Sequence, residues 1–409
     1  MKLLLPIFLI ITADTLEAQM KNPDDYSAIH DRHKINAITS RRFTQNQMLG
    51  WIQPLSQKGA FTTKTIGTSA EGRSILIYTL GNGPVKILFW SQMHGDEPTA
   101  TMALIDLLSF FSNAPDHPVS QAIRQNLTLL IIPMINPDGA ERFQRRTAQF
   151  VDMNRDALRL ATPEAQLLKT IRDRHEPEFG FNLHDQDHRY TVGQSKDVAA
   201  IGLLAPAMDD EKSDNTVRAK AKQVAARITE ALQKFVPGHV TRYDDTFEPR
   251  AFGDNVQKWG TSTILIESGG WPGDPEKMHL RKANFIALLS AMMSIAKKDY
   301  DKADVPLYET LPFNGKNMYD IILRGATFRP SQSVLALTVD VGINVEEERD
   351  STGQIIVMAK IMDLGDLSTM AAYQDIDCAG MVFDSTDIEL QKSMPKQAVD
   401  DLLNRKRHP

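Results

Sequence analysis

Short apolar runs that alternate with helical segments constrain the fold of this chain more than any other feature of its sequence. Residues 85–90, 127–135 and 263–266 are short, mostly apolar runs, with a length typical of strands buried on both faces of a sheet. Apolar spacing predicts further strands at 74–80 and 179–183, and helices at 99–111, 217–235 and 281–297. Strands that alternate with helices predict an α/β sheet with helices on both faces.

The residue pattern changes beyond about residue 300, where strand-like runs replace the alternation of strands and helices. The chain has 409 residues, more than one domain usually holds, so we expect a large domain with a smaller companion. Runs rich in β-branched residues at 318–323, 334–341 and 355–362 are separated by turn residues. We therefore expect a main domain over 19–300 and a small β-rich domain over 301–409, which ends in a helical or frayed tail.

The N-terminus has the layout of a secretory signal peptide. Lys2 precedes an apolar run over 3–11, and Ala18 supplies a small residue before a cleavage point at Gln19. Residues 1–18 are therefore predicted to be removed from a secreted or periplasmic protein. No later segment is apolar enough to span a bilayer, so stable membrane insertion is not expected. Cys378 is the only cysteine, which excludes an intramolecular disulfide.

The charge pattern limits the kinds of partner. The formal net charge is −6, and acidic and basic residues are interspersed along the chain. There is no basic stripe of the kind that binds nucleic acid, and no polybasic patch for a membrane surface. The expected partners are therefore small molecules or peptides.

A His-Gly-Asp-Glu motif at 94–97 directly follows the apolar run over 85–90. It therefore lies at the end of a strand, where open α/β sheets place their functional sites. A histidine and a glutamate three residues apart can turn towards one cation, and imidazole with carboxylate is a zinc-type ligand set. A solvated turn before the helix at 99–111 is the alternative for this motif alone. An Asn-Pro-Asp-Gly turn at 136–139 and an Asp-Met-Asn-Arg-Asp segment at 152–156 argue against coincidence.

Together with a Gly-Thr-Ser-Ala-Glu-Gly-Arg stretch at 67–73, these motifs resemble metallocarboxypeptidase family M14, in the family's order, over roughly residues 45–295. The resemblance implies an α/β domain built on a mixed, mainly parallel sheet. It also implies one zinc ion per chain, held by His94, Glu97 and His184. Three protein ligands leave a coordination position for water, as a catalytic zinc requires.

His184 has two rivals nearby in the sequence, His175 and His188. His188 stands at helical spacing from His184, but the preceding Phe-Gly-Phe-Asn-Leu is typical of a strand, so we favour His184 as the ligand. His188 is then expected at a pocket rim or on the surface. Asp152 matches the family position that hydrogen-bonds a ligand histidine and fixes its tautomer. A turn aspartate that caps a loop is the alternative for Asp152.

A glutamate on a late strand is the family's general base, and Glu267 in the Thr-Ile-Leu-Ile-Glu-Ser-Gly-Gly segment at 263–270 matches it. A carboxylate directly after a buried apolar run is costly unless it faces a metal site or a partner. The resemblance therefore implies that Glu267 accepts the proton of an attacking water. A salt bridge is the alternative role for this residue.

An arginine after the Asn-Pro-Asp-Gly turn is expected to stabilise the negative charge that hydrolysis puts on the former carbonyl oxygen. By reach alone, Arg142, Arg145 and Arg146 all qualify. Compact bacterial members of the family place this arginine seven residues before the aspartate of Asp-x-Asn-Arg, which selects Arg145. The sequence departs from the family at Thr147, where asparagine is usual, and at Phe150, where glycine is usual. The loop is therefore expected to differ in shape.

Asn154 and Arg155 match the pair that holds the free C-terminal carboxylate of a peptide in this family. A planar guanidinium suits this role because it binds a carboxylate through two parallel hydrogen bonds. A structural ion pair of Arg155 with Asp152 or Asp156 is the alternative. Tyr243 is a candidate for the mobile tyrosine that closes over the substrate in many family members.

The resemblance implies a zinc-dependent hydrolase, namely a metallocarboxypeptidase that cleaves an amide bond next to a free carboxylate in a peptide or acyl-amino-acid substrate. A deacylase of N-acyl amino acids or a cell-wall peptide amidase would use the same site. A non-catalytic zinc-binding or ligand-binding protein is the alternative of another class. The sequence retains both the general base and the metal ligands of the family, which favours the enzyme.

Overall fold

The computed structural model describes residues 23–350, 352 and 354–407, and the predicted signal peptide over 1–18 lies outside this part of the chain. The described chain divides into two compact units. The first comprises the residues up to Gln186 together with Ala200–Phe313, and the second comprises Asp187–Ala199 together with the residues from Asn314 onward. The domain boundaries drawn from the sequence stay a prediction. Within the described ranges, no helix has the length and apolar character needed to cross a membrane.

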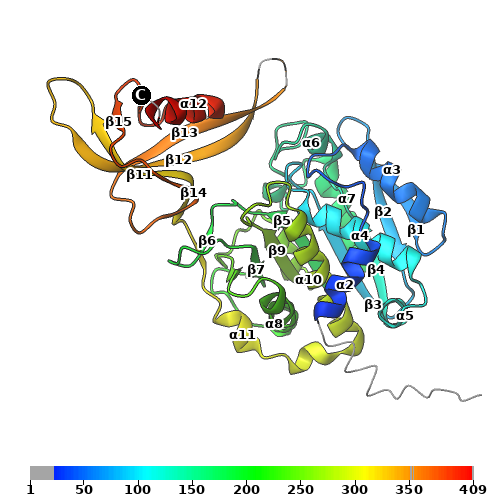
Figure 1. Ribbon diagram of the computed structural model, residues 1–409. Coiled ribbons are helices and arrows are strands. Elements are labelled where there is room, and N and C mark those ends of the chain that lie inside the picture. The colour runs from blue at the N-terminus through cyan, green and yellow to red at the C-terminus, as the bar shows by residue number, and fades with distance from the viewer. Residues whose placement is uncertain (1–22, 351, 353, 408–409) are drawn as a thin grey trace, which may run out of the picture. The chain divides into compact units, whose positions relative to one another are not determined.

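An eight-stranded mixed sheet forms the centre of the first unit (Figure 1). Its strands, in spatial order, are β1 (Thr62–Thr68), β2 (Ser74–Leu80), β4 (Leu127–Ile132), β3 (Val85–Ser91), β5 (Phe179–Asp185), β9 (Ser262–Ser268), β7 (Ile201–Leu204) and β8 (Val240–Arg242). The central strands β4, β3, β5 and β9 run parallel, whereas β1, β2 and β7 add antiparallel pairings on either side. The predicted mixed, mainly parallel sheet is therefore confirmed.

Helices cover both faces of this sheet. Successive residues of a buried strand point to opposite faces, so an apolar strand gives the sheet two apolar faces, and each needs a covering layer. In β3, Ile87 and Phe89 enter one core, while Leu88 and Trp90 enter the other. The first core is closed by α2 (Pro23–His33), α3 (Gln45–Ser56), α4 (Thr99–Asn113), α5 (Pro118–Asn126), α8 (Thr216–Phe235) and α10 (Met278–Lys297). The second core is closed by α7 (Pro163–His175) and α9 (Phe252–Lys258). Helices on both faces, as predicted, are thus confirmed.

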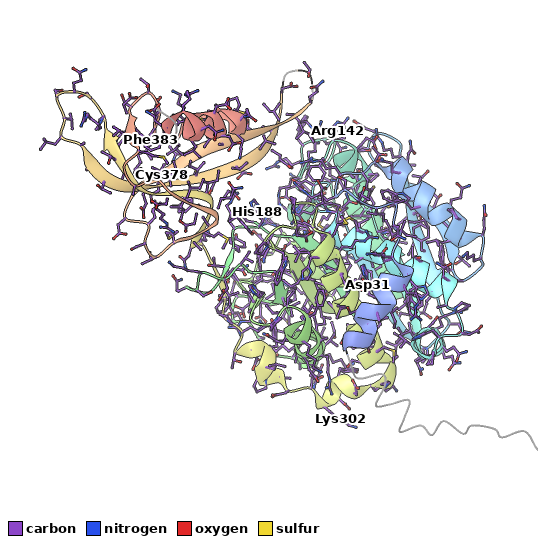
Figure 2. All side chains as sticks on the ribbon, viewed as in Figure 1. Asp31, Arg142, His188, Lys302, Cys378 and Phe383 are labelled. Atoms are coloured by element: carbon purple, nitrogen blue, oxygen red, sulfur yellow. The ribbon has the colours of Figure 1, made fainter. Side chains whose placement is uncertain are left out.

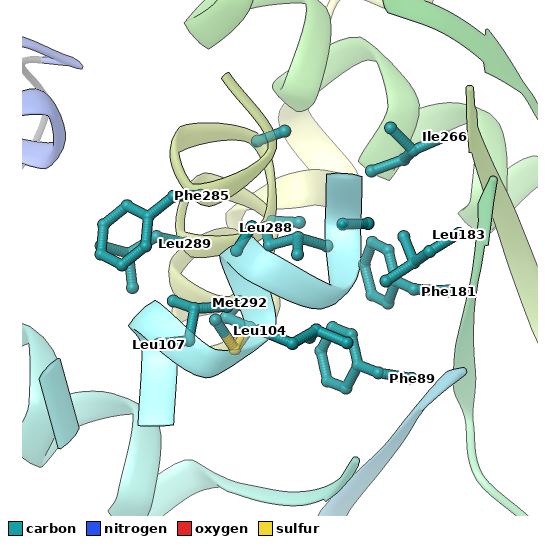
Figure 3. Close-up of a cluster of buried hydrophobic side chains, with 14 of the residues drawn as sticks. Phe89, Leu104, Leu107, Phe181, Leu183, Ile266, Phe285, Leu288, Leu289 and Met292 are labelled. Atoms are coloured by element: carbon teal, nitrogen blue, oxygen red, sulfur yellow. The ribbon is translucent and has the colours of Figure 1, made fainter. Parts of the chain in front are cut away.

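Figure 3 shows the part of the first core that lies between α4, α10 and the sheet. Phe89 of β3 and Phe181 of β5 stack there, with ring centres 4.8 Å apart. Leu104 of α4 and Leu288 of α10 are fully buried in the same cluster. Burying one such large side chain contributes about 1.5–3 kcal/mol. This packing holds β3 and β5 in place, and the candidate site begins where these two strands end.

The chain stays with the first unit for some residues beyond 300. The short helices η2 (Asp299–Lys302) and α11 (Val305–Glu309) follow α10. The hydroxyl of Tyr308 on α11 accepts a hydrogen bond from the main-chain N–H of Ala205 at 2.9 Å. Residues of α11 therefore contribute to the first unit's core rather than to the β-rich unit.

A second sheet forms the β-rich unit. It runs in the order β14 (Ala371–Asp377), β11 (Met318–Arg329), β12 (Leu337–Arg349), β13 (Ile355–Gly365) and β16 (Ser393–Pro395), with β15 (Val382–Asp384) paired to β11. The tail helix α12 (Lys396–Arg407) contributes to its core, where Cys378 and Phe383, labelled in Figure 2, are fully buried. In the same unit, β6 (Thr191–Val192) pairs with β10 (Asn314–Gly315). The predicted β-rich C-terminal region is thus confirmed.

Candidate metal centre

The candidate metal centre lies at the carboxyl ends of three neighbouring parallel strands. β3 leads into the loop that carries His94 and Glu97, and β5 carries His184 near its end. Glu267 on β9 is the register partner of His184, so these two residues stand side by side on adjacent strands. Within the described residues, His94, Glu97 and His184 form a buried group whose ligand atoms all lie within 4.8 Å of one another. The structure thus brings together the residues predicted as metal ligands.

The loop after β3 is fixed by the Asn-Pro-Asp-Gly turn, which begins the short helix α6 (Pro137–Glu141). Asn136 Nδ2 donates to the carbonyl of Met93 at 3.1 Å, and Asn136 Oδ1 accepts from the N–H of Gly139 at 2.9 Å. Gly95 lies so close to this turn that a Cβ atom would come within 2.0 Å of the carbonyl carbon of Gly139. Only glycine allows such an approach, so the two motifs interlock into one structure.

Hydrogen bonds orient the two histidines towards one point. Nδ1 of His94 lies 2.8 Å from Oε1 of Glu97, and Nδ1 of His184 lies 2.7 Å from Oε2 of the same carboxylate. The other ring nitrogen of His94, Nε2, lies 3.0 Å from Oδ1 of Asp152. A carboxylate only accepts hydrogen bonds, so Asp152 favours the tautomer with the proton on Nε2. Nδ1, which faces Glu97 and Arg145, is then the nitrogen that would bind a metal. Asp152 also caps the 3-10 helix η1 (Met153–Arg155), so the turn role and the orienting role coexist.

Burial and charge shift the pKa values of these groups. Burial lowers the pKa of His94, but the charge of Glu97 and the hydrogen bond with Asp152 outweigh it and raise this pKa to about 9. Burial raises the pKa of Glu97, but the charges of His94 and His184 outweigh burial and hold this pKa well below its usual range. The charged Glu97 therefore attracts a cation towards the two rings. Two imidazoles and one carboxylate are a donor set that fits zinc with an open position.

Glu267 lies beside this group, and only 8% of its surface is exposed. Burial raises the pKa of its carboxyl well above the usual range, and the negative charge of Glu97 raises it further. A carboxylate with a raised pKa is suited to taking and returning a proton near neutral pH. The position and pKa of Glu267 therefore suit a general base, a role that stays a prediction.

Of the three candidate arginines, Arg145 is the one that contacts the metal centre. Its Nη1 donates to Oε1 of Glu97 at 3.2 Å, and its Nε and Nη2 donate to Oδ2 of Asp152 at 3.1 and 2.9 Å. Arg142, labelled in Figure 2, and Arg146 each donate to a main-chain carbonyl nearby in the sequence. The placement favours Arg145 as the electrophile, because its guanidinium lies beside the candidate ligand Glu97.

The loop that carries Arg145 contains an unusual backbone conformation at Phe150. Its φ is 62°, in the left-handed region that favours glycine, and 77% of the residue is exposed. The N–H of Phe150 donates to the carbonyl of Thr147 at 2.9 Å, and the N–H of Thr147 donates to the carbonyl of Val151 at 3.0 Å. The turn thus takes a glycine-type conformation although the residue is phenylalanine.

Two of the predicted substrate-binding residues, Asn154 and Arg155, lie on η1. Oδ1 of Asn154 accepts a hydrogen bond from the N–H of Phe252 at 2.8 Å, which ties η1 to the start of α9. Arg155 Nη1 donates to the carbonyl of Asn154 at 2.8 Å, and its side chain is 39% exposed. Tyr243 directly follows β8, and its N–H donates to the carbonyl of Leu203 at 2.8 Å. Its role as a closing tyrosine stays a prediction.

A buried group beside the ligands was not predicted from the sequence. Asp185 follows His184 directly, and its N–H donates to Oε2 of Glu97 at 3.2 Å. Its carboxylate accepts from Thr99 Oγ1 at 2.6 Å and from Lys277 Nζ at 3.2 Å. Asp185 therefore supports the position of Glu97. The position of Asp185 at the end of a buried strand could have indicated this role from the sequence. Nothing in the sequence indicates that the distant Lys277 is its partner.

The two rival histidines lie elsewhere. His175 is the last residue of α7. His188, labelled in Figure 2, belongs to the second unit, where its Nε2 lies 2.8 Å from Oδ1 of Asp320. Neither belongs to the candidate ligand group in the described part of the chain.

Comparisons with known proteins show what the chain is similar to. Residues 48–246 match the family profile described as zinc carboxypeptidase. Among curated relatives, Carboxypeptidase SOL1 of Arabidopsis thaliana is 31% identical over 127 residues, which are 27% of this chain and 26% of that protein. Carboxypeptidase 2 of Trichophyton tonsurans is 26% identical over 209 residues, which are 48% of this chain and 38% of that protein. The matches thus span well under half the length of these relatives.

Solved structures show the same fold. A metallo-carboxypeptidase from Burkholderia cenocepacia aligns with a TM-score of 0.51 at 17% identity, over 63% of this chain and 70% of that one. Bovine thrombin-activatable fibrinolysis inhibitor, solved in complex with tick carboxypeptidase inhibitor, also aligns with a TM-score of 0.51, at 13% identity, over 64% of this chain and 98% of that one. At these identities the likeness concerns the fold alone.

Proposed function

From the premise that residues 48–246 of this chain belong to the zinc carboxypeptidase family, we propose that the protein is a metallocarboxypeptidase with one zinc ion per chain. It hydrolyses the amide bond next to the free carboxylate at the end of a peptide. The observation that supports this most directly is the placement of Glu267 and Arg145 beside the His94, Glu97 and His184 group. A binding protein would not need a buried carboxyl with a raised pKa at this position.

In the proposed reaction each residue has one task. Zinc held by His94, Glu97 and His184 would polarise the scissile carbonyl and make a water more acidic. Glu267 takes the proton of the attacking water and delivers it to the leaving amine. Arg145 donates hydrogen bonds to the carbonyl oxygen as negative charge develops on it.

Substrate binding is assigned to Asn154 and Arg155. The guanidinium of Arg155 is partly exposed and receives the C-terminal carboxylate through two parallel hydrogen bonds. Arg155 does not pair with Asp152, whose Oδ2 is held by Arg145. The ion pair of Arg155 is with Glu248 at Nε, and its side chain is 39% exposed, so its outer N–H groups can reach a ligand. The fixed carboxylate places the scissile bond at the metal centre.

Arg155→Ala should raise KM for peptides with a free C-terminus by about ten- to a hundredfold, because a hydrogen bond to a charged group contributes about 1.5–3 kcal/mol. Peptides with an amidated C-terminus lack the charge, so the variant and the wild type should handle them alike. Steady-state kinetics on matched acid and amide peptides measure both effects. A wild-type preference for the amidated peptides would contradict the proposed carboxypeptidase function. Faster turnover of acyl-amino acids or cell-wall peptides in the same assay would favour a deacylase or an amidase.

We also propose that the protein is exported, because residues 1–18 have the layout of a signal peptide. Expression of the full chain in a cell with an export pathway should give a mature protein that begins at Gln19. Mass spectrometry of the exported fraction measures this directly. A protein that stays inside the cell and still begins at Met1 would contradict the proposal.

A further inference from the structure

The arginine assigned to substrate binding has a charged neighbour that belongs to none of the sequence motifs. Oε2 of Glu248 lies 3.4 Å from Nε of Arg155. The same carboxylate is held firmly by Arg250, whose Nε donates to Oε1 at 2.9 Å and whose Nη2 donates to Oε2 at 2.7 Å. Glu248 therefore stands between two guanidinium groups, and it binds Arg250 more closely than Arg155.

The segment that carries Glu248 is hydrogen-bonded to residues on both sides of Arg155. The N–H of Ala157 donates to the carbonyl of Arg250 at 3.1 Å. The N–H of Phe252 donates to Oδ1 of Asn154 at 2.8 Å. These two bonds hold the segments side by side, which brings Glu248 within reach of Arg155.

The carboxyl of Glu248 stays ionised at neutral pH. Hydrogen bonds from Arg250 lower the pKa of its carboxyl to about 2, and the positive charge of Arg155 acts in the same direction. Arg250 contacts both of its oxygens, so Glu248 keeps this partner when a substrate carboxylate approaches Arg155. Glu248 thus remains a fixed acceptor beside Arg155 when a substrate arrives.

The contact is made at one edge of the guanidinium. Arg155 presents Nε to Glu248, and its Nη1 donates to the carbonyl of Asn154 at 2.8 Å. The hydrogen bond at Nη1 and the ion pair at Nε restrict the plane of the guanidinium, and with it the direction of the remaining N–H groups. A preorganised arginine loses less side-chain entropy when it binds a carboxylate.

We propose that Glu248, held by Arg250, is a positioning residue that fixes the guanidinium of Arg155 for the carboxylate of the substrate. The proposal rests on the proposed carboxypeptidase function. Because Arg155 contacts a part of the substrate that does not react, its orientation affects binding of ground state and transition state alike. The effect of Glu248 therefore appears in KM and leaves kcat unchanged.

Glu248→Gln should raise KM for free-acid peptides by about three- to tenfold without a change in kcat, a size expected for a partly exposed charged contact. Arg250→Gln should act in the same direction, because it releases Glu248. The matched control is Glu230→Gln, which removes a carboxylate that pairs with Arg227 at 3.0 Å on α8, away from the metal centre. It should leave both constants unchanged.

A double-mutant cycle separates positioning from a general electrostatic effect. In the Arg155→Ala background, Glu248→Gln should have no further effect on KM, because the group that it orients is gone. Additive effects, an unchanged KM in Glu248→Gln, or a lower KM would each overturn the proposal. If Arg155→Ala itself leaves KM for free acids unchanged, the carboxypeptidase function fails. If Arg155→Ala raises KM and Glu248→Gln does not, only the positioning role fails.

Discussion

Replacing Glu267 with glutamine should lower kcat by about a hundredfold or more, the scale for the loss of a general base. Glutamine keeps the shape of the side chain but does not accept a proton from water. Because Glu267 is not one of the three ligands, zinc should still bind in full. Because it does not hold the substrate carboxylate, KM should change little. The loss should therefore appear in turnover alone.

This outcome is measured by steady-state kinetics together with the zinc content of the purified variant. Glu164→Gln is a matched control, because Glu164 on α7 is also a fully buried glutamate whose pKa is raised by burial. Its Oε1 accepts from the N–H of Ala70 at 3.1 Å rather than facing the ligands, so the control should keep wild-type turnover. Full activity of Glu267→Gln would remove the proposed mechanism.

His184→Ala should lose the bound zinc, and with it all activity. The affinity of a zinc site depends on the number and geometry of its ligands, and this change removes one of three from the protein. Nδ1 of His184 lies 2.7 Å from Oε2 of Glu97, so its loss also removes the closest contact of that carboxylate oxygen. Inductively coupled plasma mass spectrometry after dialysis measures zinc per chain, with about one expected for the wild type and almost none for the variant.

His188→Ala is the matched control for this experiment. His188 lies four residues further along the chain, but its ring contacts Asp320 in the second unit. The variant should therefore keep its zinc. Zinc loss in His188→Ala together with zinc retention in His184→Ala would reverse the ligand assignment.

The central strands are predictable because a strand covered by helices on both faces needs apolar side chains at nearly every position. β2 and β3 begin where the apolar runs begin, at Ser74 and Val85. The edge strand β1 is mostly exposed and has no such run, so the sequence did not predict it. The helix α7 buries few residues, so its apolar spacing is weak and the sequence did not predict it either.

The sequence by itself determined the fold class, the family and the strand ends at which His94, Glu97, His184 and Glu267 are found. A residue at the end of a buried strand has its position set by the local backbone, which apolar patterning predicts. Only the tertiary structure decided that Arg145 faces Glu97 and that Glu248 lies beside Arg155. An arginine side chain is long and has many rotamers, so its direction depends on partners that are distant in the sequence. Those partners come together only when the whole domain has packed.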